Sequence, residues 1–130
     1  MKFAIQVNAS PYQAQAGESA YQFIKAALAM GHAIVRVFFY YDGVYHGFGG
    51  CRPPQDEPQP LQRWSELADD HGVDLVLCIS AAKRRGLLTT TEAGAEGIAP
   101  GPVAPGFRIA GLGLWVEACL QADRVLVFRA

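Results

Sequence analysis

Cys78 and the basic residues that follow it form the stretch of the sequence best suited to chemistry. Cys78 lies near the end of an apolar run, residues 73–79, and Lys83, Arg84 and Arg85 come soon after it. A thiolate is the reactive form of cysteine, and both helix amide dipoles and nearby cations favour that charged form. These residue types at this spacing predict a nucleophilic thiol in an activating setting.

The elements around Cys78 would place the thiol at the edge of a sheet. The run 73–79 is aliphatic apart from Asp74 and is too short for a typical helix, which predicts a strand buried on both faces. We expect Ser80 to cap a short helix that ends at Gly86. Cys78 would then lie at the carboxyl end of the strand, where reactive groups of α/β proteins gather.

The same residues also have ordinary structural interpretations. A cysteine at a strand end is commonly a small buried hydrophobic residue, and cations near a helix end are favourable to its dipole. Three cations in one turn point in different directions, so only some of Lys83, Arg84 and Arg85 could approach the sulfur of Cys78. The residues by themselves leave both interpretations open.

Two further cysteines receive no chemical role. Cys119 follows Trp115 on the apolar face of a predicted helix, residues 112–122, so packing explains it. Cys51 lies in a glycine-rich loop with His46 five residues before it, which could suggest a metal site or a Cys-His nucleophile pair. Two possible ligands in a loop are a weak signal, and we expect no metal and no cofactor.

Other motifs are equally unspecific. His32 before a strand and His71 at a helix end have plain structural explanations. The Gly-Phe-Gly-Gly segment, residues 47–50, does not join a strand to a helix and lacks the spacing of a dinucleotide-binding fingerprint. No phosphate site is therefore expected there.

The pattern along the chain alternates between strands and helices. Runs rich in β-branched and aromatic residues predict strands, and apolar residues at helical spacing predict helices that end at glycines. Strands are expected at residues 3–7, 33–41, 73–79 and 125–128, helices at 18–30, 61–71, 80–86 and 112–122, and irregular loops at 47–60 and 94–106. This order predicts an α/β fold, a three-layer α/β/α domain with a mostly parallel central sheet of about five strands.

Composition limits the classes of protein that remain. The 130 residues, 51% of them hydrophobic, are enough for one core, so we expect a single domain over residues 1–130. A net charge of −1 disfavours binding to nucleic acid or to a membrane surface. We expect no signal peptide, no membrane span and a cytoplasmic protein with free thiols, because three widely spaced cysteines suggest neither a disulfide framework nor a zinc site.

The segment from Cys78 to Gly86, read as CISAAKRRG, resembles the DsrE/TusD family of sulfur-relay proteins. The resemblance is strongest to members from sulfur-oxidising bacteria, and subunits that serve tRNA thiolation are close kin. It extends over nearly the whole chain, through residues 1–5, 19–23, 37–40, 42–45, 92–94 and 106–113.

The resemblance implies an intracellular sulfurtransferase subunit that acts in dissimilatory sulfur oxidation. Cys78 matches the family cysteine that carries sulfane sulfur as a persulfide and passes it to a cysteine of a carrier protein. It also implies a heterohexamer with two related small subunits, DsrF-like and DsrH-like, and sulfur-donor and sulfur-acceptor proteins as partners. The resemblance assigns no role to Cys51.

The sequence leaves other functions open. A sulfur relay for tRNA 2-thiouridine synthesis, a non-catalytic structural subunit of the same complex and a redox-sensing thiol are each compatible with it. Ser80, Lys83, Arg84 and Arg85 are expected on physical grounds to stabilise the thiolate or persulfide of Cys78, with at least one of the cations close to the sulfur.

Overall fold

The computed structural model describes residues 1–49, 54–56, 60–87 and 103–130. Its strands form one sheet in which every pairing is parallel, in the order β4-β3-β2-β1-β5. The strands are β1 (Lys2–Val7), β2 (Ala33–Phe39), β3 (Leu75–Cys78), β4 (Phe107–Ala110) and β5 (Arg124–Phe128). Parallel neighbours need crossover connections, and these connections supply the helices.

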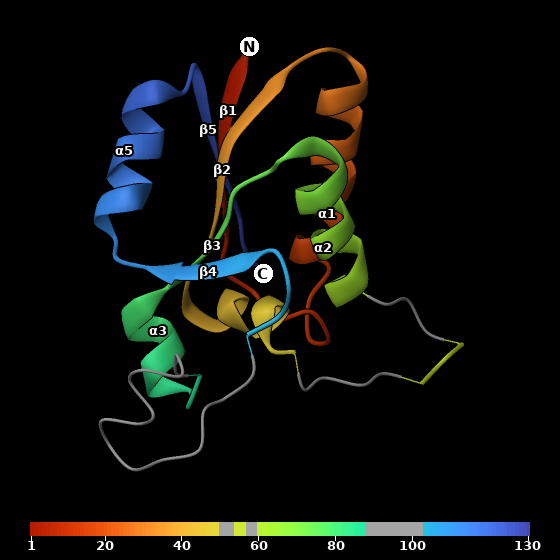
Figure 1. Cartoon of the computed structure of the whole chain (residues 1–130), viewed down its shortest axis with the longest axis vertical. Coiled ribbons are helices and arrows are strands. Elements are labelled where there is room, and N and C mark those ends of the chain that lie inside the picture. The colour runs from red at the N-terminus through yellow and green to blue at the C-terminus, as the bar shows by residue number, and fades with distance from the viewer. Residues whose placement is uncertain (50–53, 57–59, 88–102) are drawn as a thin grey trace.

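The helices complete three layers. Helices α1 and α2 cover one face of the sheet and α5 covers the other, while α3 and the 3₁₀ helix η1 lie at the edge where the strands end (Figure 1). The bounds are α1 (Ala16–Ala29), η1 (Tyr41–Gly47), α2 (Pro60–His71), α3 (Ile79–Arg84) and α5 (Gly113–Gln121). The predicted α/β/α architecture is confirmed. In the part of the chain that the structure describes, no helix is both long and apolar enough to cross a membrane.

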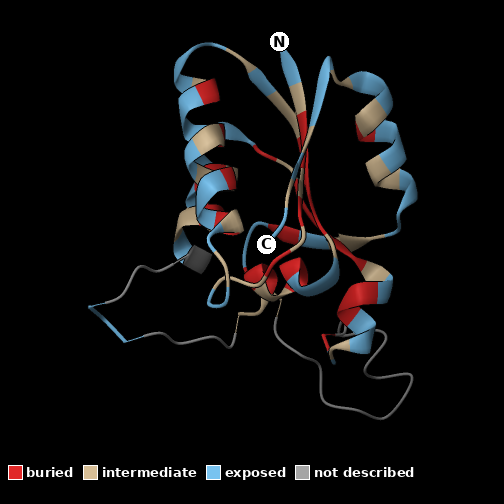
Figure 2. Ribbon diagram, turned by 180° about the vertical axis from the view of Figure 1, so that it is seen from behind, coloured by how far each residue is buried: buried red, intermediate tan, exposed pale blue. Residues whose placement is uncertain are grey.

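The core follows the alternation of side chains along the strands. Buried residues concentrate in the strands and at the edge of the sheet that carries η1 and α3 (Figure 2). Phe39 faces α2, with its ring centroid 5.2 Å from that of Trp64, whereas the neighbouring Phe38 faces α5 and lies 5.9 Å from Trp115. Both phenylalanines are fully buried within this chain, so they are not part of a contact surface with a partner.

Glycines end the helices where the sequence predicts. Gly31 and Gly72 follow α1 and α2 with φ angles of +85° and +65°, a region that side chains rarely adopt. The predicted helices at 18–30 and 112–122 are present with slightly shifted ends, as Ala16–Ala29 and Gly113–Gln121. Helix periodicity therefore located these elements well.

Several predicted boundaries are wrong, and one strand was not predicted. Strand β2 ends at Phe39 rather than at residue 41, because Tyr41 has a φ angle of +48° and begins η1. Strand β3 is shorter than the predicted run 73–79, since Ile79 is already helical. Strand β4 follows the glycine- and proline-rich stretch that we expected to be irregular. Cys51 and most of residues 94–106 lie outside the described residues.

Candidate functional site

Cys78 lies at the point where the central strand β3 becomes helix α3. All four residues of β3 are buried, and Cys78 has extended dihedral angles of −62° and 124°. Ile79 follows as the first helical residue, so Cys78 itself is the N-cap of α3. The cysteine is free and its side chain is 3% exposed. The thiol therefore belongs to the residue that precedes the first turn of α3.

Ser80 is not the helix cap that we predicted. It is the second residue of α3 and is exposed, and no side-chain capping hydrogen bond is made at this helix start. The prediction failed because the apolar run continues through Ile79, which hides the change from strand to helix. The backbone amide of Ser80 is one of those at the start of the helix that have no acceptor within the helix.

The thiol lies on the face of the sheet that α5 covers. Leu77 points toward η1, because a side chain on Gly47 would collide with the methyl groups of Leu77. Successive residues of a strand point to opposite faces, so Cys78 points away from η1. Its neighbour across the ladder is the small residue Ala110 of β4.

Aromatic side chains flank the same edge on the other side of β3. Phe39, the last residue of β2, pairs with Leu77, so Tyr40 follows the strand at about the level of Cys78. Tyr40 stacks on Tyr41, with ring centroids 4.3 Å apart and planes 12° apart, and Tyr41 is 56% exposed. A stacked aromatic pair, of which Tyr40 is half-buried and Tyr41 is exposed, therefore lies next to the strand end that carries the thiol.

The three cations after Cys78 have different surroundings. Lys83 and Arg84 lie in the last turn of α3 and are exposed. Arg85 donates from Nε to Asp42 Oδ1 at 2.9 Å, and from Nη1 to the Ala81 carbonyl at 3.0 Å. Arg85 is thus bound to Asp42 near the start of η1. The sequence did not indicate this contact.

Helix α3 ends as predicted at Gly86. Gly86 has a φ angle of +80° and donates to the Lys83 carbonyl at 3.1 Å, and Leu87 donates to the Ala82 carbonyl at 2.9 Å. These two bonds are the pattern of a Schellman motif, and the side chain of Leu87 is fully buried behind it. The short helix is therefore fixed at its end by the core.

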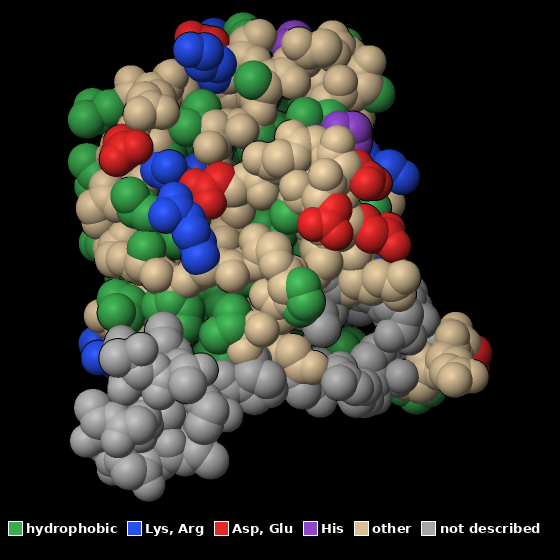
Figure 3. Space-filling view, viewed as in Figure 1, with side chains coloured by type: hydrophobic (Ala, Val, Ile, Leu, Met, Phe, Trp, Pro, Cys, Tyr) green, Lys and Arg blue, Asp and Glu red, His purple; other side chains and the backbone are tan. Residues whose placement is uncertain are grey.

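A charged network fixes the opposite end of β3. Asp74 accepts from Arg36 Nε at 2.6 Å and from two nitrogens of Arg108 at 2.9 and 2.8 Å. Arg36 also donates to the Leu114 carbonyl of α5 at 2.8 Å. Partial burial acts to raise the pKa of Asp74, but Arg108 and Arg36 together lower it below its ordinary value. Basic and acidic side chains are seen in contact beside α5 (Figure 3).

The remaining candidates have structural surroundings. Cys119 is partly buried in α5, and burial raises the pKa of its thiol, which disfavours the reactive thiolate. His32 Nδ1 lies 3.0 Å from the amino-terminal nitrogen of the chain, and His71 is exposed. His46 is buried, and its Nε2 bonds the Ala9 carbonyl. Within the described ranges, no three His, Cys, Asp or Glu side chains cluster as metal ligands would.

Comparison with known proteins gives consistent matches over nearly the full chain. Residues 1–128 match the model of the DsrE/DsrF-like family. A protein of Allochromatium vinosum that carries the name sulfurtransferase DsrE is 52% identical over 128 residues, which cover 98% of both chains. The sulfurtransferase TusD of Cronobacter sakazakii is 42% identical over 128 residues, which are 98% of this chain and all of that one.

A solved structure has the same fold. The ychN protein from E. coli superposes with a TM-score of 0.77 at 25% sequence identity, covering 98% of this chain and 99% of that one. The parallel sheet and its flanking helices therefore belong to an architecture that is already known.

Proposed function

The chain belongs to the DsrE/DsrF-like family, and on this premise we propose that it is a sulfurtransferase whose Cys78 carries sulfane sulfur as a persulfide. The observation that carries the proposal is the position of Cys78. It is a free thiol at the N-cap of α3, at the carboxyl edge of a parallel sheet. Reactive groups of α/β proteins gather at this edge.

The chemistry is an exchange of thiolate partners without net oxidation. The Cys78 thiolate attacks the outer sulfur of a donor persulfide, a new sulfur–sulfur bond forms at Cys78, and the donor leaves as a thiolate. An acceptor thiolate then attacks the outer sulfur on Cys78, and the Cys78 thiolate is released. One sulfur atom at the oxidation level of zero moves from donor to acceptor in each cycle.

The surroundings of Cys78 support an anionic sulfur. The first amides of α3, including those of Ile79 and Ser80, have no acceptor within the helix, and the helix dipole is positive at this end. Lys83 and Arg84 add positive charge one turn further on. A persulfide places its transferable outer sulfur about 2 Å beyond the cysteine sulfur.

We place this activity in dissimilatory sulfur oxidation. The support is the greater identity to the protein named DsrE, 52%, than to the one named TusD, 42%. A relay that supplies sulfur for tRNA 2-thiouridine is the alternative. The donor and the acceptor are carrier proteins with reactive cysteines, and the chain acts in the cytoplasm as one DsrE-like domain over residues 1–130.

We also propose that the chain assembles with two related small subunits, DsrF-like and DsrH-like, into a heterohexamer. The support is an apolar stripe along α5, the surface formed by Leu112, Val116 and Leu120, which are 47%, 54% and 83% exposed. Residues four apart share one side of a helix, so this stripe is continuous. A purely structural subunit would use the same stripe, and only the chemistry of Cys78 separates the two functions.

Transfer of sulfur to a thiol acceptor tests the function. The protein is loaded with inorganic polysulfide, freed of excess reagent and mixed with a cysteine-containing peptide whose persulfide is followed by mass spectrometry. Wild type and Cys119→Ser should transfer sulfur, and Cys78→Ser should not. Equal transfer by Cys78→Ser would assign the sulfur to another cysteine, and no transfer by wild type would favour the structural subunit over the sulfurtransferase.

A further inference from the structure

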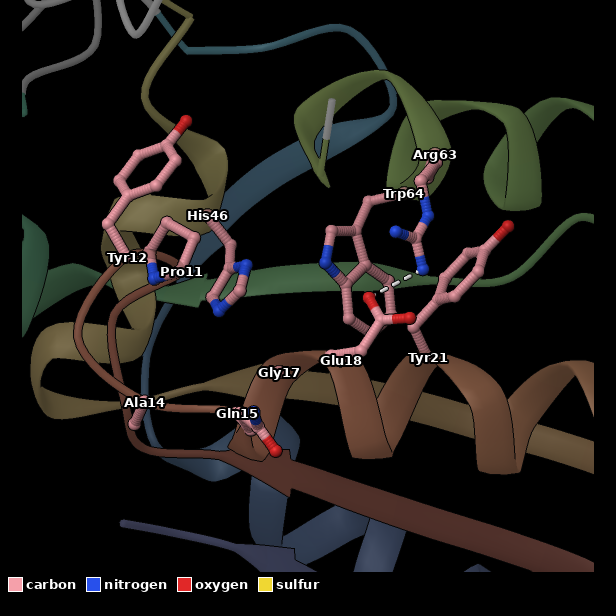
Figure 4. A pocket seen from close by; sticks show the side chains of 10 residues that line it. All are labelled: Pro11, Tyr12, Ala14, Gln15, Gly17, Glu18, Tyr21, His46, Arg63 and Trp64. Carbon is pink, nitrogen blue, oxygen red and sulfur yellow. Dashed lines mark hydrogen bonds and ion pairs between the residues drawn. The ribbon is translucent and has the colours of Figure 1, made fainter. Parts of the chain in front are cut away.

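A cavity of about 430 Å³ lies on the face of the sheet opposite Cys78. Its walls come from the loop after β1, the first turns of α1, η1 and α2 (Figure 4). Cys78 points to the α5 face, away from η1, and neither Cys78 nor a residue of α3 is among the described residues that line this cavity. The cavity is therefore not part of the proposed sulfur site.

The position of His46 at the cavity shows that the wall is closely packed. A side chain on Gly17 would collide with the imidazole, so only glycine lets the first turn of α1 approach this ring. His46 is 3% exposed, and its Nε2 lies 3.1 Å from the Ala9 carbonyl, which makes Nε2 the protonated nitrogen. Burial lowers the pKa of His46 to about 4, so the ring is neutral near pH 7.

The second ring nitrogen of His46 is an unused acceptor. Nδ1 is buried and finds no hydrogen-bond partner among the described residues. The indole nitrogen of Trp64, whose side chain is 1% exposed, is on the side of its ring that faces the imidazole (Figure 4). The cavity wall thus carries an N–H donor and a lone-pair acceptor on two neighbouring rings, whose centroids lie 5.9 Å apart and whose planes are 79° apart.

The charges at the rim of the cavity cancel. Arg63 Nη2 donates to Glu18 Oε2 at 2.6 Å, and the guanidinium lies 4.0 Å from the centroid of the Tyr21 ring. Hydrogen bonds from Gln22 and Arg63 lower the pKa of Glu18, so the pair is one anion and one cation. With His46 neutral, the lining carries no net charge, which disfavours a charged occupant.

We propose that this cavity binds a small uncharged molecule with a flat apolar body and a primary amide or hydroxyl group. Such a group accepts from the Trp64 indole and donates to His46 Nδ1, while the apolar body packs against the aromatic walls. Sites built to hydrogen-bond a polar group reject analogues that lack it, because the buried partners are then left unpaired. The inference is independent of the chemistry of Cys78.

Three related probes test the binding site. Benzamide offers both a donor and an acceptor, N,N-dimethylbenzamide only an acceptor, and benzoate a charge. Titrations of the full chain are followed by the backbone amide resonances of Gly17 and Glu18 and by the indole resonance of Trp64. Benzamide should cause saturable shifts, and the dimethyl compound and benzoate should each bind about tenfold more weakly or worse.

Variants separate this site from nonspecific binding. Trp64→Phe removes the indole N–H but keeps an aromatic ring, so it should weaken benzamide about tenfold while thermal unfolding shows that the protein still folds. Trp115→Phe changes the other tryptophan, which lies on α5, and should bind benzamide as wild type does. The proposal is overturned if benzamide causes no saturable shift, if benzoate binds as well as benzamide, or if both variants bind alike.

Discussion

Asp42 binds Arg85, with Asp42 Oδ1 2.9 Å from Nε and 2.8 Å from Nη2 of the guanidinium. This ion pair joins the start of η1 to the end of α3, the two elements on either side of the strand end that carries Cys78. The charge of Arg85 is thereby partly compensated. Lys83 and Arg84 are the exposed cations of the same turn.

The different surroundings of these cations predict different effects on the Cys78 thiolate. The double change Lys83→Met with Arg84→Met should slow alkylation of Cys78 by iodoacetamide at pH 7 about two- to fivefold, as expected for the loss of exposed charges. Arg85→Met should change the rate less. Peptide mass spectrometry measures the rate, with Cys119 in the same sample as the internal reference. A larger effect of Arg85→Met than of the double change would contradict this assignment.

Asp74 should contribute to stability in a pH-dependent way. Asp74→Asn weakens the bonds to Arg36 and Arg108, and Arg36 is buried, so the free energy of unfolding should fall by about 1–3 kcal/mol at pH 7. Because the folded pKa of Asp74 is lowered, its contribution is complete above the ordinary aspartate range and is lost as the pH falls through the folded value. Urea unfolding at pH 7 and pH 3 measures both effects.

The exposed Asp70 of α2 offers a matched control for Asp74. Asp70→Asn should change the free energy of unfolding by less than about 0.5 kcal/mol at either pH, as is usual for surface substitutions. Equal losses for the two substitutions would mean that the network with Arg36 and Arg108 does not stabilise the fold.

His46 should make the fold sensitive to mild acid. Its pKa is about 4 when folded against an ordinary value of 6.5, so the neutral ring stabilises the fold fully above pH 6.5 and this stabilisation is lost between pH 6.5 and about 4. Between pH 7.5 and 5.5, the loss should be about 1–2 kcal/mol. Urea unfolding of wild type and His46→Gln measures it, and the variant should lack this component. An identical pH dependence in both proteins would show that His46 is not the group responsible.

The apolar stripe on α5 predicts an effect on assembly without an effect on folding. Leu120 is 83% exposed, so Leu120→Glu should leave thermal unfolding of the isolated chain nearly unchanged. It should prevent co-purification with the two related subunits, since a charge would enter a buried contact. Met30→Glu, at a position after α1 that is 74% exposed, is the control and should assemble. If Leu120→Glu also assembles, the stripe is not the contact surface.

The sequence predicted the layers of the fold better than the details of the site. Alternation and helical spacing located three of the five strands closely, and the run 73–79 contained a fourth. They did not reveal β4, because Phe107–Ala110 is short and follows residues typical of loops. The change from strand to helix at Cys78 was also hidden, since Ile79 continues the apolar pattern and made Ser80 look like the cap.

Contacts between distant residues were beyond the reach of sequence patterns. Arg85 and Asp42 are 43 residues apart, and nothing in their spacing indicates that they pair. His46 was weighed only as a partner of Cys51, whereas the structure buries it against Gly17 and Trp64. Cys78 itself could be selected as the candidate nucleophile, because a local sequence pattern and the resemblance to a family both pointed to it.

The central claim is that Cys78 is the residue that carries sulfur. Wild type, Cys78→Ser and Cys119→Ser are treated with inorganic polysulfide, alkylated to trap persulfides and digested, and each cysteine peptide is weighed by mass spectrometry. The account predicts a gain of one sulfur atom on the Cys78 peptide of wild type and Cys119→Ser, and no protein-bound persulfide in Cys78→Ser. Persulfide found mainly on Cys51 or Cys119, and undiminished in Cys78→Ser, would contradict it.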